Sequence, residues 1–422
     1  MNFWTSILYA FSLASLLLAG CQQKSTPTYY KVGAAVANIT PQIGAFIAGD
    51  ANGRRFEGVH DSLYIKTIVV SDKETSIALI SVDCIGLLYP TLLKIREAVA
   101  QQVAASEFQP DHIVLTSTHT HSGPDVVGIW GPAHLVSGVD SAYMNELVHK
   151  AAQTVLLALK NRQEALAYSA EGTHGEDWVV NISDSLSVDR SLNLMQFRDK
   201  NGKSIASLLN FGCHPTFLDN ANELVSADYV GGVYHQMDEQ LGGVNLFLQG
   251  AIGGWVQPEY EEKTFQNAEK RGRALAEKGL ELLQKSRPMQ ATSLSYKRKQ
   301  IQLPVSNPVF QQLSALGVLD RPVTNQLTTE IAWFTIGNAP FATHPGETTP
   351  MHALQTKALM PGQGPKFVIG LGMDALGYIL SPNFFDPNNP LKHTDYMLSM
   401  SIDPEAGPVL LQRLSELALE QR

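Results

Sequence analysis

The stretch from 76 to 118 decides the fold class. It reads SIALISV (Ser76–Val82), then YPTLLKIREAVAQQVAA (Tyr89–Ala105), then IVLTST (Ile113–Thr118). The first and third runs have the apolar, β-branched composition of buried strands, and the second has apolar residues at helical spacing. Strand, helix and strand in succession indicate an α/β protein.

The same alternation continues on both sides of this stretch. Further strands are predicted at 63–70, 192–197, 205–211 and 245–248, and further helices at 142–160, 229–241, 263–285, 348–359 and 406–421. Strands near 292–303 and 329–336 favour antiparallel additions, so we expect a mixed β-sheet core with flanking helices. Long loops are expected at 128–138 and 360–365, where Gly and Pro are frequent. The segment 287–328 is the best place for a subdomain boundary.

The composition fits a large enzyme core. Of the 422 residues, 44% are apolar and 17% charged, which excludes a disordered chain or a coiled coil. The 31 Lys and Arg against 40 Asp and Glu give a net charge of −9 without a basic stripe, so nucleic acid is not an expected partner.

The N-terminus has the pattern of a targeting signal. Residues 1–20 carry no charge and lead into Leu18-Ala19-Gly20-Cys21, which resembles the lipobox of a bacterial lipoprotein. We therefore expect a signal peptide at 1–20, lipidation of Cys21, a tether over 21–31 and one domain over 32–422, exported and held at the outer membrane or periplasmic face. The alternative is an uncleaved anchor helix, because no Lys or Arg precedes the apolar run.

Two further cysteines, Cys84 and Cys213, lie in apolar stretches. Export permits a disulfide between them, but buried free cysteine also packs as a small apolar side chain, and we favour free thiols.

Candidate metal ligands follow several predicted strands. The strand Ile113–Thr118 ends in His119-Thr120-His121, and in extended backbone residues i and i+2 share a face, so these two imidazoles should project together. The strand at 205–211 leads into His214-Pro215, where proline ends the ladder.

A third strand end offers a carboxylate. It reads His344-Pro345-Gly346-Glu347, with Glu347 expected at the start of a helix capped by Thr348 or Thr349, and with His344 as a rival ligand. A fourth segment, 370–379, adds Tyr378. Two neutral imidazoles and a carboxylate are the protein ligands of many catalytic zinc sites.

These blocks resemble a known family. THTHSGP (118–124), His214-Pro215-Thr216, PGETT (345–349) and Tyr378-Ile379 are similar, in this order, to blocks of the neutral ceramidase catalytic domain, over roughly 32–400. Weaker matches are Gly58–Asp61 and Ser226–Asp228. The resemblance implies the ceramidase catalytic-domain fold, a catalytic zinc held by His119, His214, Glu347 and Tyr378, and hydrolysis of an N-acyl bond in a lipid-like substrate such as an N-acyl sphingoid base.

The chain departs from the family at two places. Where ceramidases carry Gly-Asp-x-Ser-Pro with a serine assigned a catalytic role, this chain reads QGAIGGWVQP (249–258) without Ser or Asp. Ceramidases also continue into a C-terminal β-sandwich, whereas this sequence ends about 75 residues after Glu347, so we expect the catalytic domain without that module. We expect the glycine run to approach the metal pocket closely, with Trp255 as a wall.

The sequence therefore predicts a zinc hydrolase that attacks an amide with metal-activated water, which needs no side-chain nucleophile. His121 is expected to orient the water or carry its proton, although a purely structural hydrogen bond is the alternative. Tyr378 is expected either to bind zinc or to donate to the developing oxyanion.

Weaker candidates surround this site. Asp83 and Asp228 are hydrogen-bond partners for a ligating imidazole or else helix and loop caps, and His60 with Asp61 anchors a loop near the site. Arg54 and Arg55 either clamp an anionic group or form a solvated turn. Two other functions remain open: hydrolysis of an ester or lactone, and binding of a lipid or glycan without turnover.

Overall fold

The computed structural model describes residues 29–218, 220–259 and 262–420. The predicted signal peptide, the tether up to residue 28 and the lipidated Cys21 lie outside these residues. The first described strand begins at Tyr30, two residues before the predicted start of the domain.

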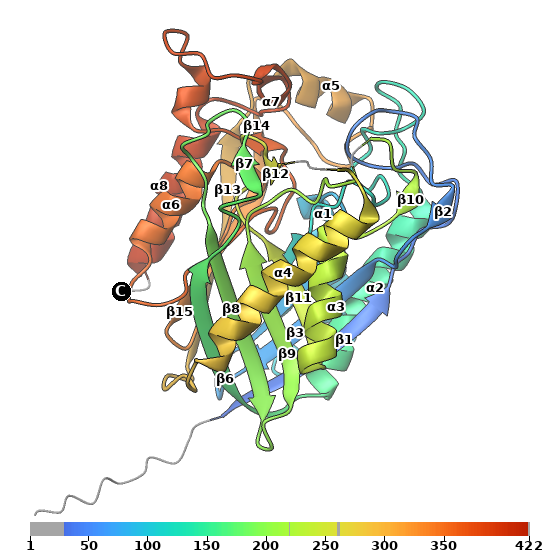
Figure 1. Cartoon of the computed structure of the whole chain (residues 1–422). Helices are drawn as coiled ribbons and strands as arrows, with labels where there is room; N and C mark the ends of the chain where they lie inside the picture. The colour runs from blue at the N-terminus through green and yellow to red at the C-terminus, as the bar shows by residue number, and fades with distance from the viewer. Residues whose placement is uncertain (1–28, 219, 260–261, 421–422) are drawn as a thin grey trace, which may run out of the picture.

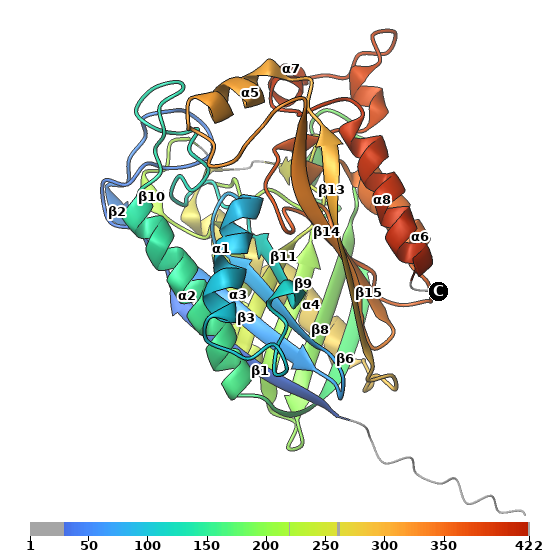
Figure 2. The same ribbon diagram turned by 180° about the vertical axis from the view of Figure 1, so that it is seen from behind.

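The elements alternate along the chain as predicted (Figures 1 and 2). The helices are α1 (Tyr89–Ala100), α2 (Ser141–Lys160), α3 (Tyr229–Leu241), α4 (Phe265–Gln284), α5 (Pro308–Ala315), α6 (Pro350–Leu359), α7 (Asp395–Ser399) and α8 (Ala406–Glu420), with short 3-10 turns η1 (Pro110–His112) and η2 (Pro382–Phe385). The strands are β1 (Tyr30–Asn38), β2 (Gly58–Val59), β3 (Tyr64–Ser71), β4 (Ser76–Val82), β5 (Ile113–Ser117), β6 (Gln163–Thr173), β7 (Val179–Asn181), β8 (Ser191–Asp199), β9 (Ser204–Phe211), β10 (Leu224–Val225), β11 (Val244–Gln249), β12 (Val256–Pro258), β13 (Leu294–Pro304), β14 (Gln326–Ile336), β15 (Ala339–Thr343), β16 (Glu347–Thr348), β17 (Phe367–Ile369) and β18 (Tyr378–Ile379).

An eight-stranded mixed sheet forms the main core, in the order β11-β9-β8-β6-β1-β3-β4-β5. The outer pairs β11/β9 and β4/β5 are parallel and the inner pairs antiparallel. The sheet is curled, so that its two sides come together. Ser81 on β4, next to one edge, donates a hydrogen bond of 2.5 Å to the carbonyl of Phe247 on β11, the other edge. Helix α2 covers β1 and β3 with α1 packed beside it, and α3 and α4, packed together, cover β11, β8 and β6 (Figures 1 and 2).

A second sheet, β13-β14-β15-β17, packs with α6 and α8 around its own apolar cluster. It begins inside the segment 287–328. The buried Arg96 on α1 joins the two parts of the molecule, since its guanidinium donates to both carboxylate oxygens of Glu330 on β14 (3.1 and 2.7 Å).

The predicted fold class is confirmed, with local differences. Helix α1 ends at Ala100, five residues earlier than its pattern suggested, and β1 and β6 were not anticipated. Glu347 is in the short strand β16 rather than at a helix start, and Thr349 is the N-cap of α6 without a side-chain capping bond. Cys84 and Cys213 are buried free thiols.

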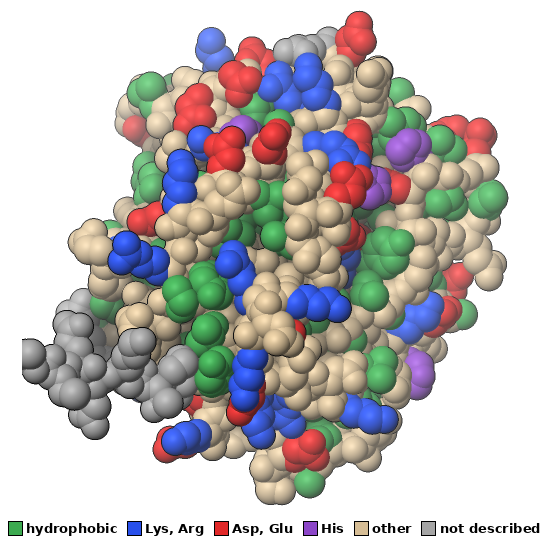
Figure 3. Space-filling view, turned by 60° about the horizontal axis from the view of Figure 1, so that its bottom comes forward, with side chains coloured by type: hydrophobic (Ala, Val, Ile, Leu, Met, Phe, Trp, Pro, Cys, Tyr) green, Lys and Arg blue, Asp and Glu red, His purple; other side chains and the backbone are tan. Residues whose placement is uncertain are grey.

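Across the described ranges, no helix is long and apolar enough to cross a bilayer. On the face seen in Figure 3, acidic and basic side chains are interspersed.

Candidate metal centre and cavity

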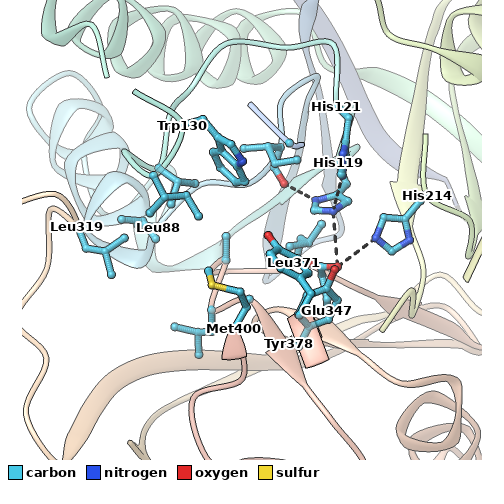
Figure 4. A pocket seen from close by; sticks show the side chains of 18 of the residues that line it. Leu88, His119, His121, Trp130, His214, Leu319, Glu347, Leu371, Tyr378 and Met400 are labelled. Atoms are coloured by element: carbon cyan, nitrogen blue, oxygen red, sulfur yellow. Dashed lines mark hydrogen bonds and ion pairs between the residues drawn. The ribbon is translucent and has the colours of Figure 1, made fainter. Parts of the chain in front are cut away.

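Four chain segments meet at one end of the two sheets and bring the predicted ligands together (Figure 4). His119 follows β5 and His214 follows β9. Glu347 on β16 and Tyr378 on β18 are register partners in a parallel pair, so their side chains leave the strands at the same level. All four side chains line one cavity.

The distances between the candidate donor atoms fit a small metal ion. Glu347 Oε2 lies 3.1 Å from His214 Nε2 and 3.6 Å from His119 Nε2. With zinc–ligand bonds of about 2.0–2.2 Å, neighbouring donors of a tetrahedral site are roughly 3.4 Å apart. The Tyr378 hydroxyl also hydrogen-bonds to the Glu347 carboxylate. This donor set therefore fits zinc.

The two imidazoles are held with Nε2 toward this point. His119 Nδ1 lies 2.5 Å from the Ile85 carbonyl oxygen, and His214 Nδ1 lies 2.8 Å from the Val256 carbonyl oxygen. A carbonyl only accepts hydrogen bonds, so each Nδ1 carries the proton and each Nε2 keeps a free lone pair.

These partners correct the prediction that Asp83 and Asp228 orient the ligands. Asp83 instead accepts bonds from the Tyr64 amide and the Tyr234 hydroxyl (2.9 and 3.0 Å). Asp228 caps α3, where it accepts from the amide of Tyr229, as the alternative interpretation had it. Backbone carbonyls next to the site serve the same purpose as a carboxylate and leave no extra buried charge.

Gln249, the last residue of β11, joins the two turns that carry the histidines. Its side chain is fully buried, and Nε2 donates to the carbonyls of Thr118 (2.8 Å) and Cys213 (3.0 Å), the residues just before His119 and His214. Sequence reasoning missed this role, because contact between two turns about 95 residues apart depends on the curl of the sheet.

The imidazole of His121 lies beside that of His119 as predicted, but for a different reason. His119 has a φ of +70° rather than an extended backbone, and this left-handed kink brings the His121 Nε2 to 3.3 Å from the His119 Nε2. Donor atoms of His119, His121 and His214 all lie within 4.8 Å of one another, so His121 is geometrically a third possible imidazole ligand.

Burial controls the charge of these groups. It lowers the pKa of both His119 and His121 to about 3, which leaves the imidazoles neutral at physiological pH. Burial by itself raises the pKa of the Glu347 carboxyl, but His119, His214 and the Tyr378 hydroxyl together hold it below its usual value. Neutral imidazoles and an ionised carboxylate are the forms that bind a metal.

A carboxylate that the sequence did not single out faces His121. Asp50 Oδ1 lies 4.0 Å from His121 Nδ1, and Asp50 Oδ2 accepts a bond from Arg54 (3.3 Å). Gly49 permits this approach, because a Cβ on it would lie 2.6 Å from His121 Nδ1. In this structure the Arg54 side chain is 10% exposed and pairs with Asp50, which is neither the solvated turn nor the anion clamp that the sequence left open.

The glycine run after Gln249 touches the site through backbone. A Cβ on Gly253 would lie 2.4 Å from the carbonyl oxygen of Glu347, so only glycine fits. Trp255 lines the cavity as predicted, and its Nε1 donates to the Tyr378 hydroxyl (2.8 Å).

Three other candidates are placed elsewhere. His344 is buried with both ring nitrogens beside the hydroxyls of Thr348 and Thr356 (2.7 and 3.0 Å), so it is not a rival ligand in this structure. His60 stacks on Phe265 at a ring-centroid distance of 3.7 Å. Arg55 packs over Phe46, and neither it nor His60 is among the residues that line the cavity.

The cavity has a polar end and an apolar end. Its volume is about 580 Å³. The candidate ligands stand at one end, and apolar side chains, among them Leu88, Trp130, Leu319 and Met400, line the part that extends away from His214 (Figure 4). A cavity of this shape offers separate polar and apolar surfaces to a ligand.

Known proteins resemble this chain in sequence and in fold. Neutral ceramidase A of Dictyostelium discoideum is 22% identical over 276 residues, which is 56% of this chain and 37% of that protein. Neutral ceramidase of Pseudomonas aeruginosa is 22% identical over 271 residues, 59% of this chain and 40% of that protein. This chain thus spans about two fifths, or less, of the curated relatives it matches.

The crystal structure of the Pseudomonas aeruginosa neutral ceramidase superposes with a TM-score of 0.77 at 17% identity, over 94% of this chain and 75% of that one. This likeness shows a shared fold. The family model "Neutral/alkaline non-lysosomal ceramidase, N-terminal" matches residues 30–258, more than half of the 422 residues. The chain therefore belongs to the neutral/alkaline non-lysosomal ceramidase family.

Proposed function

We propose that the chain is a zinc-dependent hydrolase that cleaves the amide bond of an N-acyl, lipid-like substrate. The observation that carries the proposal is the pair of imidazoles, each fixed by a carbonyl on Nδ1, whose Nε2 atoms lie 3.1 and 3.6 Å from the oxygen of one buried carboxylate. Side chains that served only the core would not need both free lone pairs directed at one point.

In this proposal His119, His214 and Glu347 hold the metal, and Tyr378 stands beside Glu347. Zinc bound there supplies acidification of a water and polarisation of a carbonyl. No side-chain nucleophile is required, so the missing family serine does not contradict the proposal.

The chain's own residues supply positioning and proton transfer. His121 Nε2 lies at the ligand cluster and Asp50 faces its other nitrogen, so this imidazole is placed to carry a proton toward the leaving nitrogen. Trp255 fixes the Tyr378 hydroxyl, which is placed to donate to an oxyanion if it does not bind the metal.

The apolar end of the cavity suits the acyl chain. At about 30 Å³ for each group the size of a water molecule, the cavity of about 580 Å³ holds roughly 19 such groups. That volume accommodates the amide and one chain of about a dozen carbons. Burial of the chain would stabilise the complex by about 25 cal/mol for each Å² of apolar surface removed from water. A second long chain would have to remain outside.

Export and attachment to a membrane surface through Cys21 complete the proposal. They rest on the sequence pattern alone, since Cys21 is outside the described residues.

The test is a substrate screen of the zinc-loaded and the chelated protein with N-acyl sphingoid bases, N-acyl amino acids, esters and lactones. The proposal expects hydrolysis of at least one N-acyl compound, its loss on chelation and its return with zinc. His214→Ala should abolish it, whereas His235→Ala, at a half-exposed imidazole paired with Glu269, should not. Turnover of lactones alone would remove the amidase assignment.

A further inference from the structure

A second cavity, of about 290 Å³, shares no lining residue with the cavity at the metal centre. Its walls come from β1, β3, α3, the start of β11 and the loop before β3. Helix α3 and strand β3 both pack against β11, so these elements enclose the cavity together (Figures 1 and 2). It is therefore a separate place in which a small molecule can bind.

Lys66 on β3 is the unusual group in this second cavity. The residue is only 5% exposed, and its ammonium lies over the ring of Tyr234, 3.2 Å from the centroid. Among the residues that the structure describes, no hydrogen-bond acceptor and no carboxylate pairs with Nζ. A buried ammonium in such a position lacks a partner for its N–H groups.

The ammonium of Lys66 can be reached from the cavity. Some side-chain nitrogens of the described residues have no hydrogen-bond partner and are sealed from solvent, such as Nε of Arg96 and of Arg321. Nζ of Lys66 is not one of these sealed atoms, although it also lacks a hydrogen bond. It therefore keeps open surface, and Lys66 lines the cavity.

The pKa of Lys66 agrees with a charge that lacks a close counterion. Burial lowers it to about 8, although the Asp83 and Asp238 carboxylates act in the opposite direction. The ammonium form still predominates at pH 7. A ligand beside Nζ must therefore offer an acceptor, and an anionic acceptor suits a poorly solvated cation best.

Two carboxylates, Asp61 and Asp238, also line this cavity. Asp61 accepts hydrogen bonds from the Ser226 hydroxyl and the Ala227 amide (3.1 and 2.9 Å), yet burial still raises the pKa of its carboxyl. Asp238 accepts a bond from the side-chain amide of Asn245 (2.6 Å). These donors are uncharged, so both carboxylates can still bind a cation.

The charges of the walls define the kind of ligand. Lys66 against Asp61 and Asp238 leaves one negative charge in excess, while His235, which also lines the cavity, is paired with Glu269 (3.0 Å). A metal ion would be repelled by the ammonium, and a simple anion by the two carboxylates. A molecule with one carboxylate and two cationic groups complements all three charges.

The size and the apolar part of the cavity fit the same kind of molecule. Val36 and Val244 add apolar surface to the walls, which suits a methylene chain. At about 30 Å³ for each group the size of a water molecule, 290 Å³ holds roughly ten groups, as many as free lysine contains.

We propose that this cavity binds a free amino acid with a cationic side chain, with the carboxylate on Lys66 and the two cationic groups on Asp61 and Asp238. The proposal goes beyond the hydrolase function and does not depend on it, because none of these three residues lines the metal cavity.

The first test is calorimetric binding of free L-lysine and three analogues to the wild-type protein. Cadaverine lacks the carboxylate, norleucine lacks the side-chain ammonium, and 6-aminohexanoic acid lacks the α-ammonium. Each analogue should bind at least about tenfold more weakly than lysine, because each leaves one charge of the cavity without its counterion. Equal affinity for cadaverine would show a simple cation site and refute the role of Lys66, and absence of lysine binding at millimolar concentration would refute the site.

The same titration of the chelated protein excludes binding at the metal centre, since amino acids also bind zinc. Lysine should bind equally well with and without zinc. Loss of binding on chelation would place lysine at the metal and overturn the proposal.

Three variants test the contacts. In Lys66→Met lysine should bind no better than cadaverine, and in Asp238→Asn, which changes an exposed side chain, lysine should bind about tenfold more weakly. Glu239→Gln is the control, because this exposed neighbour pairs with Arg273 and does not line the cavity; it should bind lysine as the wild type does. Asp238→Asn carries the test if Lys66→Met does not fold. Wild-type affinity in Asp238→Asn, or an equal loss in Glu239→Gln, would overturn the proposal.

Discussion

Replacing Gln249 by methionine should loosen both histidine-bearing turns at once. The substitution nearly conserves volume but removes the amide that donates to the carbonyls of Thr118 and Cys213. It also removes the Oε1 that accepts from the amides of Cys213 and Gly250 (3.3 and 3.1 Å). The side-chain bridge between the turns before His119 and His214 would then be lost.

The expected magnitude follows from these bonds. The Thr118 carbonyl loses its donor and the Cys213 amide loses its acceptor in a fully buried place, whereas the Cys213 carbonyl keeps the bond from the Tyr229 hydroxyl (2.8 Å). At about 1–3 kcal/mol for each of the two unsatisfied groups, the free energy of unfolding should fall by roughly 2–6 kcal/mol. Movement of a catalytic group by about 1 Å costs roughly 10²-fold in rate. Zinc affinity should fall at least about tenfold.

The assays are urea unfolding of the zinc-free protein, competition of zinc with a chromophoric chelator, and hydrolysis of the best substrate. Gln196→Met is the matched control, because Gln196 is equally buried but bonds to Arg198 on its own strand. Wild-type zinc affinity and rate in Gln249→Met would refute the idea that this residue positions the ligands.

Three further changes test other parts of the site. In Gly253→Ala the new Cβ, 2.4 Å from the Glu347 carbonyl oxygen, should displace β16 and lower kcat/KM about 10²-fold, whereas unchanged kinetics would show that the strand yields freely. His214→Ala should lose zinc by elemental analysis, while His121→Ala should keep it and lose about 10²–10⁴-fold in rate; zinc loss in the second would make His121 a ligand. Burial raises the pKa of the Asp83 carboxyl to about 6, with a smaller contribution from Asp61 and against the lowering by Lys66 and Tyr234, so the folded state holds this proton more tightly than the unfolded state. Its stabilisation is therefore complete below about pH 4 and is lost as pH rises through about 6, by up to about 3 kcal/mol, and Asp83→Asn should flatten unfolding free energy against pH over that window. An unchanged profile in the variant would contradict the assignment.

Strand ends with histidine or glutamate were visible in the sequence because they are local patterns. An apolar run that stops at His119, His214 or Glu347 can be recognised without knowing the fold, and the resemblance of these blocks supplied the family, which the comparisons confirmed. The α/β alternation was equally local, and most predicted strands and helices match within a few residues.

What could not be predicted depends on contacts between distant segments. Gln249 and Asp50 gain their roles only when the curled sheet and the loop after β1 meet the histidines. The backbone at His119 has a left-handed φ and is not extended as expected, although the imidazoles of His119 and His121 still lie side by side. Carbonyls replaced the expected Asp83 and Asp228 because sequence patterns reveal side chains and not the direction of backbone groups.

The zinc content of the purified chain, measured together with its hydrolysis of N-acyl compounds, tests the central claim most directly. The account predicts about one zinc per chain, loss of hydrolysis when a chelator removes it, and recovery of both when zinc is returned. A chain that holds far less than one zinc after growth with the metal, or that hydrolyses the same amides equally well without it, would contradict the account.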